Sequence, residues 1–217
     1  MKRNADAPRT PAAELHAWAL SNVFPRGIRH AGREWALQFL FQSEFNRGDS
    51  LESSLALFWE EHDLGFAADL KRFEHVKGAL TDGQRKEVAK LHRQGKRFAE
   101  VLIRGILAIH EQLDERIAEA SKNWGVDRMG TVDRNILRIG AYEILERDDI
   151  PPVATINEAV DLAKTFSSLE SGRFVNGILD HLLKGTGRDP RGSTKKPPET
   201  APGAPGGAPG APAPGTP

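Results

Sequence analysis

Residues 150–183 read IPPVATINEAVDLAKTFSSLESGRFVNGILDHLL, and this stretch decides the fold class. Its apolar residues recur every three or four positions, the spacing that places them on one face of an α-helix. Two such stripes are present: Ile156, Ala159, Val160, Ala163 and Phe166, then Phe174, Ile178, Leu179 and Leu182. The polar residues 167–172 predict a turn between them. Pro151-Pro152 fits the end of one helix and the first turn of the next, but not a helix interior.

The same spacing continues toward the N-terminus. Two further stripes comprise Val132, Ile136, Ile139 and Gly140, and Val101, Leu102, Ile106 and Ile109. Residues 35–41, WALQFLF, are apolar on nearly every side, which indicates a helix buried on several faces. No segment alternates with the period of two that a half-buried strand requires. The sequence therefore predicts an all-α fold, a compact bundle of about seven helices.

Composition divides the chain into three parts. Nine prolines and eight glycines make up more than half of residues 185–217, and Leu, Ile, Val and aromatic residues are absent there, so we expect a disordered tail. Residues 1–25 are expected to be an N-terminal extension with a short helix over 12–23, because Pro25 and Gly27 then break the chain. The folded domain is expected at 26–184, with a polar insertion at about 65–94 that is helical from Asp82 onward.

Composition also excludes several classes of protein. Thirty Lys and Arg balance thirty Asp and Glu, so binding to a nucleic acid must come from a local patch. Without cysteine the chain has no disulfide, thiolate zinc site or cysteine nucleophile. The best apolar run, 101–109, contains Arg104 and Gly105 and is too short to span a bilayer. We expect a cytoplasmic protein without a membrane partner.

Catalytic and metal motifs are incomplete. Gly95-Lys96 resembles the end of a phosphate-binding loop, but position 90 is lysine where that loop needs glycine. His110-Glu111 lacks the second histidine of a metalloprotease helix, since position 114 is aspartate. The seven histidines show no paired ligand spacing. We predict a protein that is not an enzyme and that has no metal or cofactor.

Basic residues cluster at the start of the first domain helix. Arg26, Arg29 and Arg33 stand at i, i+3 and i+7, so they share one helix edge, with His30 beside them. Positive charge at a helix N-terminus is unfavourable, because this is the positive end of the helix dipole. If packing does not offset this cost, an anionic partner is favoured. The alternative is an ordinary solvated face.

A second basic run carries six positive charges against the single acid Glu87: Arg85, Lys86, Lys90, Arg93, Lys96 and Arg97. It is typical of a solvated helix face, or it extends a path for RNA through counterion release.

Two phenylalanines flank the predicted turn at 167–172. Phe166 ends one helix, and Arg173 and Phe174 begin the next. Rings beside an arginine can stack on unpaired bases while the guanidinium binds phosphate. The alternative is that both rings belong to the core.

Several blocks together resemble the NusB family of bacterial transcription antitermination factors. They are REWALQFLFQ (33–42), VDRNILRIGAYE (132–143), IPPV (150–153), INEAVDLAKTF (156–166) and RFVNGILD (173–180). The resemblance covers roughly residues 26–48 and 96–184, and the order and spacing of the blocks are more specific than any one of them.

This resemblance implies an all-helical fold that pairs with the ribosomal protein NusE. The pair binds the single-stranded boxA element of nascent ribosomal RNA, within an RNA polymerase antitermination complex. RNA-contacting positions of the family fall on Arg29, His30, Arg33, Phe41, Phe166, Arg173 and Phe174, and a NusE-contacting position falls on Asp133. The arginine cluster is thinner here than in the family, and either Arg26 or the second basic run is expected to compensate. Without NusE both a monomer and a homodimer remain open, since an apolar binding surface left empty often pairs with itself.

The residues are also compatible with two other functions. One is a helical protein-interaction scaffold without a role in RNA binding, whose Phe and Arg residues serve packing and solubility. The other is an RNA-binding accessory domain like that of some ribosomal RNA methyltransferases, which would need a catalytic domain after it.

Overall fold

The computed structural model describes residues 11–46, 50–121 and 125–192, and within them it contains α-helices and no strand. The helices are α1 (Ala12–Asn22), α2 (Ile28–Phe45), α3 (Leu51–Lys77), α4 (Asp82–Ala108), α5 (His110–Ser121), α6 (Thr131–Glu146), α7 (Pro152–Phe166) and α8 (Leu169–Thr186). A single 3-10 turn, Val126–Arg128, precedes α6. The predicted all-α class is confirmed, with eight α-helices in the described residues where about seven were expected.

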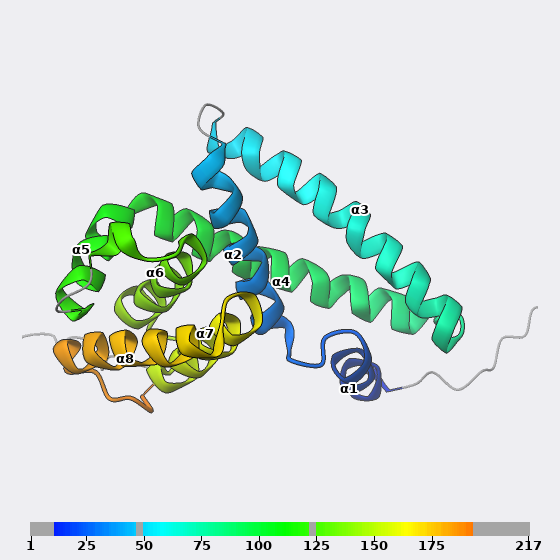
Figure 1. The fold of residues 1–217 in the computed structure, drawn as a ribbon. Helices are drawn as coiled ribbons and strands as arrows, with labels where there is room; N and C mark the ends of the chain where they lie inside the picture. The colour runs from blue at the N-terminus through cyan, green and yellow to red at the C-terminus, as the bar shows by residue number, and fades with distance from the viewer. Residues whose placement is uncertain (1–10, 47–49, 122–124, 193–217) are drawn as a thin grey trace, which may run out of the picture.

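Helix α2 lies between two groups of helices (Figure 1). On one side α5, α6, α7 and α8 pack together. On the other side α3 and α4 form a long hairpin, and α4 continues past α2 to reach α5 and α6. The core follows α2, where Trp35, Ala36, Leu37, Phe39 and Leu40 are all buried. The WALQFLF segment is thus buried on several faces, as its composition predicts.

Two glycines let α2 and α4 approach closely. A Cβ atom at Gly32 of α2 would lie 3.0 Å from the backbone oxygen of Gly95 in α4. A Cβ atom at Gly95 would lie 2.5 Å from Cζ3 of Trp35. Gly32 therefore stands among the basic residues of α2 because α4 crosses there.

The proposed insertion at 65–94 is continuous with these two helices. It comprises the last part of α3, the connection at 78–81 and the first half of α4. Thr81 begins α4 with a capping box, in which its side chain and that of Gln84 each accept a backbone N–H of the other residue. The start of α4 at Asp82 agrees with the prediction, whereas residues 65–77 are helical as well.

Half of the second basic run is paired with acids. Arg85 lies 2.6 Å from Glu74, Lys90 lies 3.2 Å from Glu87, and Lys96 lies 2.8 Å from Asp63. These pairs reduce the free positive charge of the run, which favours its interpretation as a solvated helix face.

The residues before α2 pack on the domain. Ala19 of α1 and Phe24 after it are buried, and His16 Nδ1 lies 2.8 Å from Glu87 Oε1 in α4. The expected short helix is present as α1. Residues 11–25 are therefore part of the folded unit, and residues 1–10 lie outside the described part.

Two boundaries near the C-terminus differ from expectation. Helix α8 begins at Leu169, four residues before Arg173, because Ser168 Oγ accepts the backbone N–H of Ser171 and caps the helix. The expected disordered tail also starts too early. Helix α8 continues to Thr186, and Arg188 donates to the backbone oxygens of Ile144, in the last turn of α6, and of Arg147 directly after it. The rest of the expected tail, 193–217, lies outside the described residues.

No helix in the described ranges is both long and apolar enough to cross a membrane.

Candidate nucleic-acid interface

The basic edge of α2 divides into an exposed part and a buried part. Arg26 and Arg29 are exposed, whereas His30 and Arg33 are each only 4% exposed. Arg29 and Arg33 lie one helical turn apart on α2, as their spacing predicts, whereas Arg26 precedes Gly27, the N-cap of α2, and stands outside the helix. The second half of that edge faces α6 and α7 and is covered by them.

Arg33 forms a buried bidentate ion pair. Its Nε donates to Glu143 Oε1 at 2.9 Å and its Nη2 donates to Glu143 Oε2 at 3.0 Å. Glu143 is 0% exposed and also accepts the hydroxyl of Thr155 at 2.7 Å. Two parallel charge-assisted bonds satisfy both buried charges and join α2 to α6. The assumption that this edge brings no packing gain is therefore wrong for Arg33.

His30 is held between two carboxylates. Its Nδ1 lies 2.7 Å from Glu158 Oε2 of α7, and its Nε2 lies 3.1 Å from Glu34 Oε1. Arg33 Nη1 also lies 3.3 Å from Glu158 Oε2. His30 and Arg33 thus connect α2 to α7, and neither presents a free polar group to a ligand in this arrangement.

Arg26 brings the start of α2 to the end of α7. Its Nη1 donates to Thr165 Oγ1 at 3.3 Å, next to Phe166, and also lies 3.3 Å from His30 Nε2. The two stretches from which the site was predicted are therefore adjacent, although 139 residues separate Arg26 from Thr165.

Arg29 points toward the connection between α6 and α7. Its side chain is 54% exposed and its Nη2 lies 3.6 Å from Asp149 Oδ2. Asp149 is already bound by Arg147 at 2.8 Å, and this bond, with a smaller contribution from Arg29, lowers the pKa of Asp149. Since Arg147 holds the carboxylate more closely, the Arg29 guanidinium remains available to a phosphate.

Phe41 and Phe166 meet in one groove. Each is 39% exposed, and they line the groove with Leu37, Gln38, Gln42 and Val132. Large apolar side chains left partly exposed in one depression favour a ligand that also has an apolar face. The rings come from α2 and α7, so folding has brought together two aromatic positions 125 residues apart.

Phe174 lies in a neighbouring depression with Asp133. Its ring is half-buried against the core, and the depression is completed by Arg128, Met129, Gly130, Glu170 and Ser171. Asp133 Oδ2 accepts the Ser171 hydroxyl at 2.9 Å. Because Val132 lines the first groove and Asp133 the second, the two depressions flank the start of α6. Arg173 is exposed, and no ion pair joins it to any described residue.

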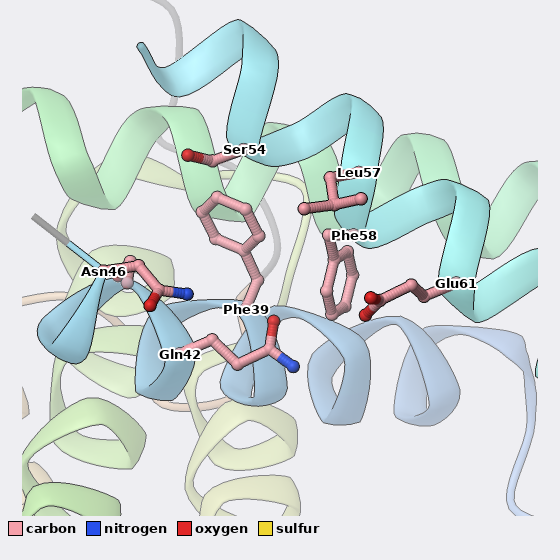
Figure 2. A pocket seen from close by; sticks show the side chains of 8 residues that line it. Phe39, Gln42, Asn46, Ser54, Leu57, Phe58 and Glu61 are labelled. Atoms are coloured by element: carbon pink, nitrogen blue, oxygen red, sulfur yellow. The ribbon is translucent and has the colours of Figure 1, made fainter. Parts of the chain in front are cut away.

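A third depression lies between α2 and α3 (Figure 2). Phe39 and Phe58 pack edge to face there, with ring centroids 5.4 Å apart, and Gln42, Asn46 and Glu61 supply polar groups. Glu61 adds negative charge, and none of the described residues that line the pocket is basic, so this depression is unfavourable for a phosphate backbone.

The interface depends on several residues that sequence spacing does not reveal. Glu143, Thr155 and Glu158 fix the position of α2, but no local motif marks them, because their partners lie on another helix. The one available signal is the position of Glu143 in an otherwise apolar helix, where a buried acid requires a basic partner.

The fold and this surface define a class: an all-helical module that presents an aromatic groove, with the exposed Arg26 at the end of α7 next to it. The chain belongs to the NusB family, whose family model matches residues 30–184. The resemblance found in the sequence is confirmed. The match includes residues 65–94 and begins just after Arg26 and Arg29.

Curated relatives and a solved structure support this assignment. The chain is 42% identical over 156 residues to the transcription antitermination protein NusB of Methylacidiphilum infernorum, covering 72% of this chain and 90% of that protein. It is 38% identical over 156 residues to that of Geobacter sulfurreducens, covering 72% and 94%. The solution structure of NusB from Aquifex aeolicus matches with a TM-score of 0.53 at 22% identity, covering 80% of this chain and 98% of that chain, which shows the shared fold.

Proposed function

We propose that this chain is a transcription antitermination factor that binds boxA-type single-stranded RNA of nascent ribosomal RNA transcripts. It does so together with the ribosomal protein NusE, and the complex keeps RNA polymerase resistant to termination. The work is recognition and tethering in the cytoplasm, without covalent chemistry or a cofactor. Membership of the NusB family supports this proposal, and so does the surface around the ends of α2 and α7.

The observation that carries the RNA-binding part is the shared groove of Phe41 and Phe166. An unpaired base offers a flat apolar face, and stacking on an aromatic ring contributes about 1–3 kcal/mol per base. An unpaired strand exposes its phosphates together with its base faces, and exposed arginines can bind those phosphates. Arg26, which is bonded to Thr165 next to Phe166, fills this role at the groove, and Arg173 fills it beside Phe174. Arg29 extends the positive charge toward the connection between α6 and α7.

His30 and Arg33 have a different role in this proposal. Their polar groups are engaged with Glu34, Glu143 and Glu158, so they hold the RNA-binding edge in place from within. Substituting them reduces RNA binding by moving α2 rather than by removing a contact.

Phe166→Ala should weaken binding of boxA RNA by about tenfold or more, the equivalent of one lost stacking contact. Fluorescence anisotropy with a labelled boxA strand, with and without NusE, measures this change. Leu64→Ala on α3 is the matched control, because Leu64 is 68% exposed and lies on another helix. Equal affinity of Phe166→Ala and wild type, with the fold intact by circular dichroism, would reject the groove as the RNA site and leave the scaffold alternative.

The partner contact centres on Asp133, which we assign to NusE. Asp133→Lys should reduce association with NusE by tenfold or more, because it reverses the charge at the start of α6. Asp133→Asn separates charge from shape, since an amide oxygen can still accept the Ser171 hydroxyl. Asp69→Lys on α3 makes the same charge change at an exposed position. Calorimetry should show weaker association with NusE for both Asp133 variants and unchanged association for Asp69→Lys. If the Asp133 variants keep the affinity of wild type, this residue is excluded from the NusE interface.

A further inference from the structure

Two histidines and an aspartate converge between α3 and α4. His62 and Asp63 belong to α3 and His92 to α4, and one potential ligand atom of each lies within 4.8 Å of the other two. His92 Nε2 lies 3.8 Å from Asp63 Oδ1, and His62 Nδ1 lies 4.0 Å from the same oxygen. The two imidazole rings are stacked, with centroids 5.4 Å apart and planes 17° from parallel.

Both converging nitrogens are buried without a hydrogen bond. Among the described side chains, His62 Nδ1 and His92 Nε2 have no hydrogen-bond partner in the protein. His92 is only 8% exposed, so its ring nitrogen is aimed into the cluster and not toward bulk water. A buried polar atom left without a partner costs about 1–3 kcal/mol, and native proteins rarely keep two such atoms side by side.

Aromatic rings surround the cluster. The Phe66 ring stacks on His92 with centroids 4.0 Å apart, and the Trp35 ring lies 4.6 Å from that of His62. Trp59 lies 5.4 Å from His62. These contacts keep both imidazoles close together, so that only a small rearrangement is needed to bind an ion.

We infer that His62, Asp63 and His92 form a binding site for a divalent transition-metal ion, with Zn²⁺ as the occupant that the ligands fit best. Two imidazoles and one carboxylate are a donor set that zinc accepts in sites with three protein ligands and one water. Hard ions such as Mg²⁺ and Ca²⁺ prefer all-oxygen ligands and do not match it.

Two features of the site set its affinity. Ligand atoms around tetrahedral zinc lie about 3.3 Å apart, given metal–ligand distances of about 2.0–2.1 Å. The present separations are somewhat larger, so the side chains must close by a small rotation. Lys96 Nζ holds Asp63 Oδ2 at 2.8 Å and must release it when a cation binds. Asp63 is free to move, since its side chain is 49% exposed.

A bound ion would tie α3 to α4 beside Trp35 of α2. It would therefore fix the hairpin at a point remote from the Phe41–Phe166 groove. The site is independent of the proposed RNA function, because none of its three residues lines that groove or the Phe174–Asp133 depression.

Isothermal titration of the untagged, chelator-treated full chain with ZnCl₂ tests the proposal. Wild type should bind one Zn²⁺ ion per chain, and Co²⁺ should produce the visible absorption of a tetrahedral site. Asp63→Asn and His62→Gln should each weaken binding by about tenfold or more, whereas Lys96→Met should strengthen it severalfold by releasing Asp63. The exposed His181→Gln on α8 is the control for histidines in general and should behave as wild type.

Thermal melting gives a second readout, since an ion that binds only the folded state raises the melting temperature. At the same concentration Zn²⁺ should raise it fully for wild type and His181→Gln but less for Asp63→Asn, whose exposed position preserves the fold. Absence of stoichiometric binding to wild type would overturn the inference. Full affinity in both Asp63→Asn and His62→Gln would overturn it as well.

Discussion

Arg33→Ala should destabilise the folded chain by about 3–5 kcal/mol, the usual cost of leaving one buried charge without its partner. Glu143 would keep only the Thr155 hydroxyl as a donor among its present side-chain partners, at a position with no exposure to solvent. The loss is large because the desolvated carboxylate has no water to replace two charge-assisted bonds.

Urea denaturation followed by circular dichroism measures this change. Arg29→Ala is the matched control, one helical turn earlier, where a 54% exposed side chain lies 3.6 Å from Asp149. An exposed pair contributes about 0–1 kcal/mol, so the control should remain close to wild type. The double variant Arg33→Met/Glu143→Met should recover most of the loss, because no buried charge is left. A loss below about 1 kcal/mol in Arg33→Ala would contradict a structural role for this arginine.

Gly95→Val is the second substitution with a large expected effect, a loss of about 3 kcal/mol, at the upper end of the usual cost of overpacking. The first added carbon would lie 2.5 Å from Trp35 Cζ3 and 2.8 Å from Ile28 Cδ1. Trp35 is enclosed by Trp59, His62 and His92 and has no room to move away. The better helix propensity of valine offsets only about 0.5 kcal/mol.

The melting temperature should therefore fall by about 6–12 °C for a domain of this size. Gly177→Val serves as the control, because Gly177 lies within α8 and a Cβ atom there would meet nothing within 4 Å. That variant should be neutral or slightly more stable. A stable Gly95→Val protein would mean that α2 and α4 do not cross at this glycine.

Helix type and position were predictable because apolar periodicity records burial directly. The stripes at 156–166 and 174–182 correspond to α7 and α8, and Asp82 begins α4 as expected. Helix boundaries that depend on single side chains were not predictable. Ser168 starts α8 early, and Arg188 extends the ordered chain past Thr186 by bonding to carbonyls of another helix. The composition of residues 185–217 does not show that one arginine near its start has a partner 44 residues away.

The residues of the candidate interface were predictable from the sequence, but which of them are exposed and which are buried was not. Spacing places Arg26, Arg29 and Arg33 on one helix edge, which is correct for Arg29 and Arg33 and wrong for Arg26, because α2 begins only at Ile28. Sequence spacing does not show that Glu143, 110 residues later, pairs with Arg33 in the core while Arg29 stays exposed. Sequence spacing fails for His62 and His92 for the same reason, since they lie on two helices that only folding brings together.

The central claim is that Phe41 of α2 and Phe166 of α7 form one surface for unpaired RNA. Photo-cross-linking with a boxA strand that carries 4-thiouridine, bound in the presence of NusE and mapped by mass spectrometry, tests it most directly. We expect cross-links in both peptides, the one with Phe41 and the one with Phe166, from neighbouring nucleotides of the same strand. Cross-links confined to the α3–α4 hairpin, with neither peptide labelled, would contradict it.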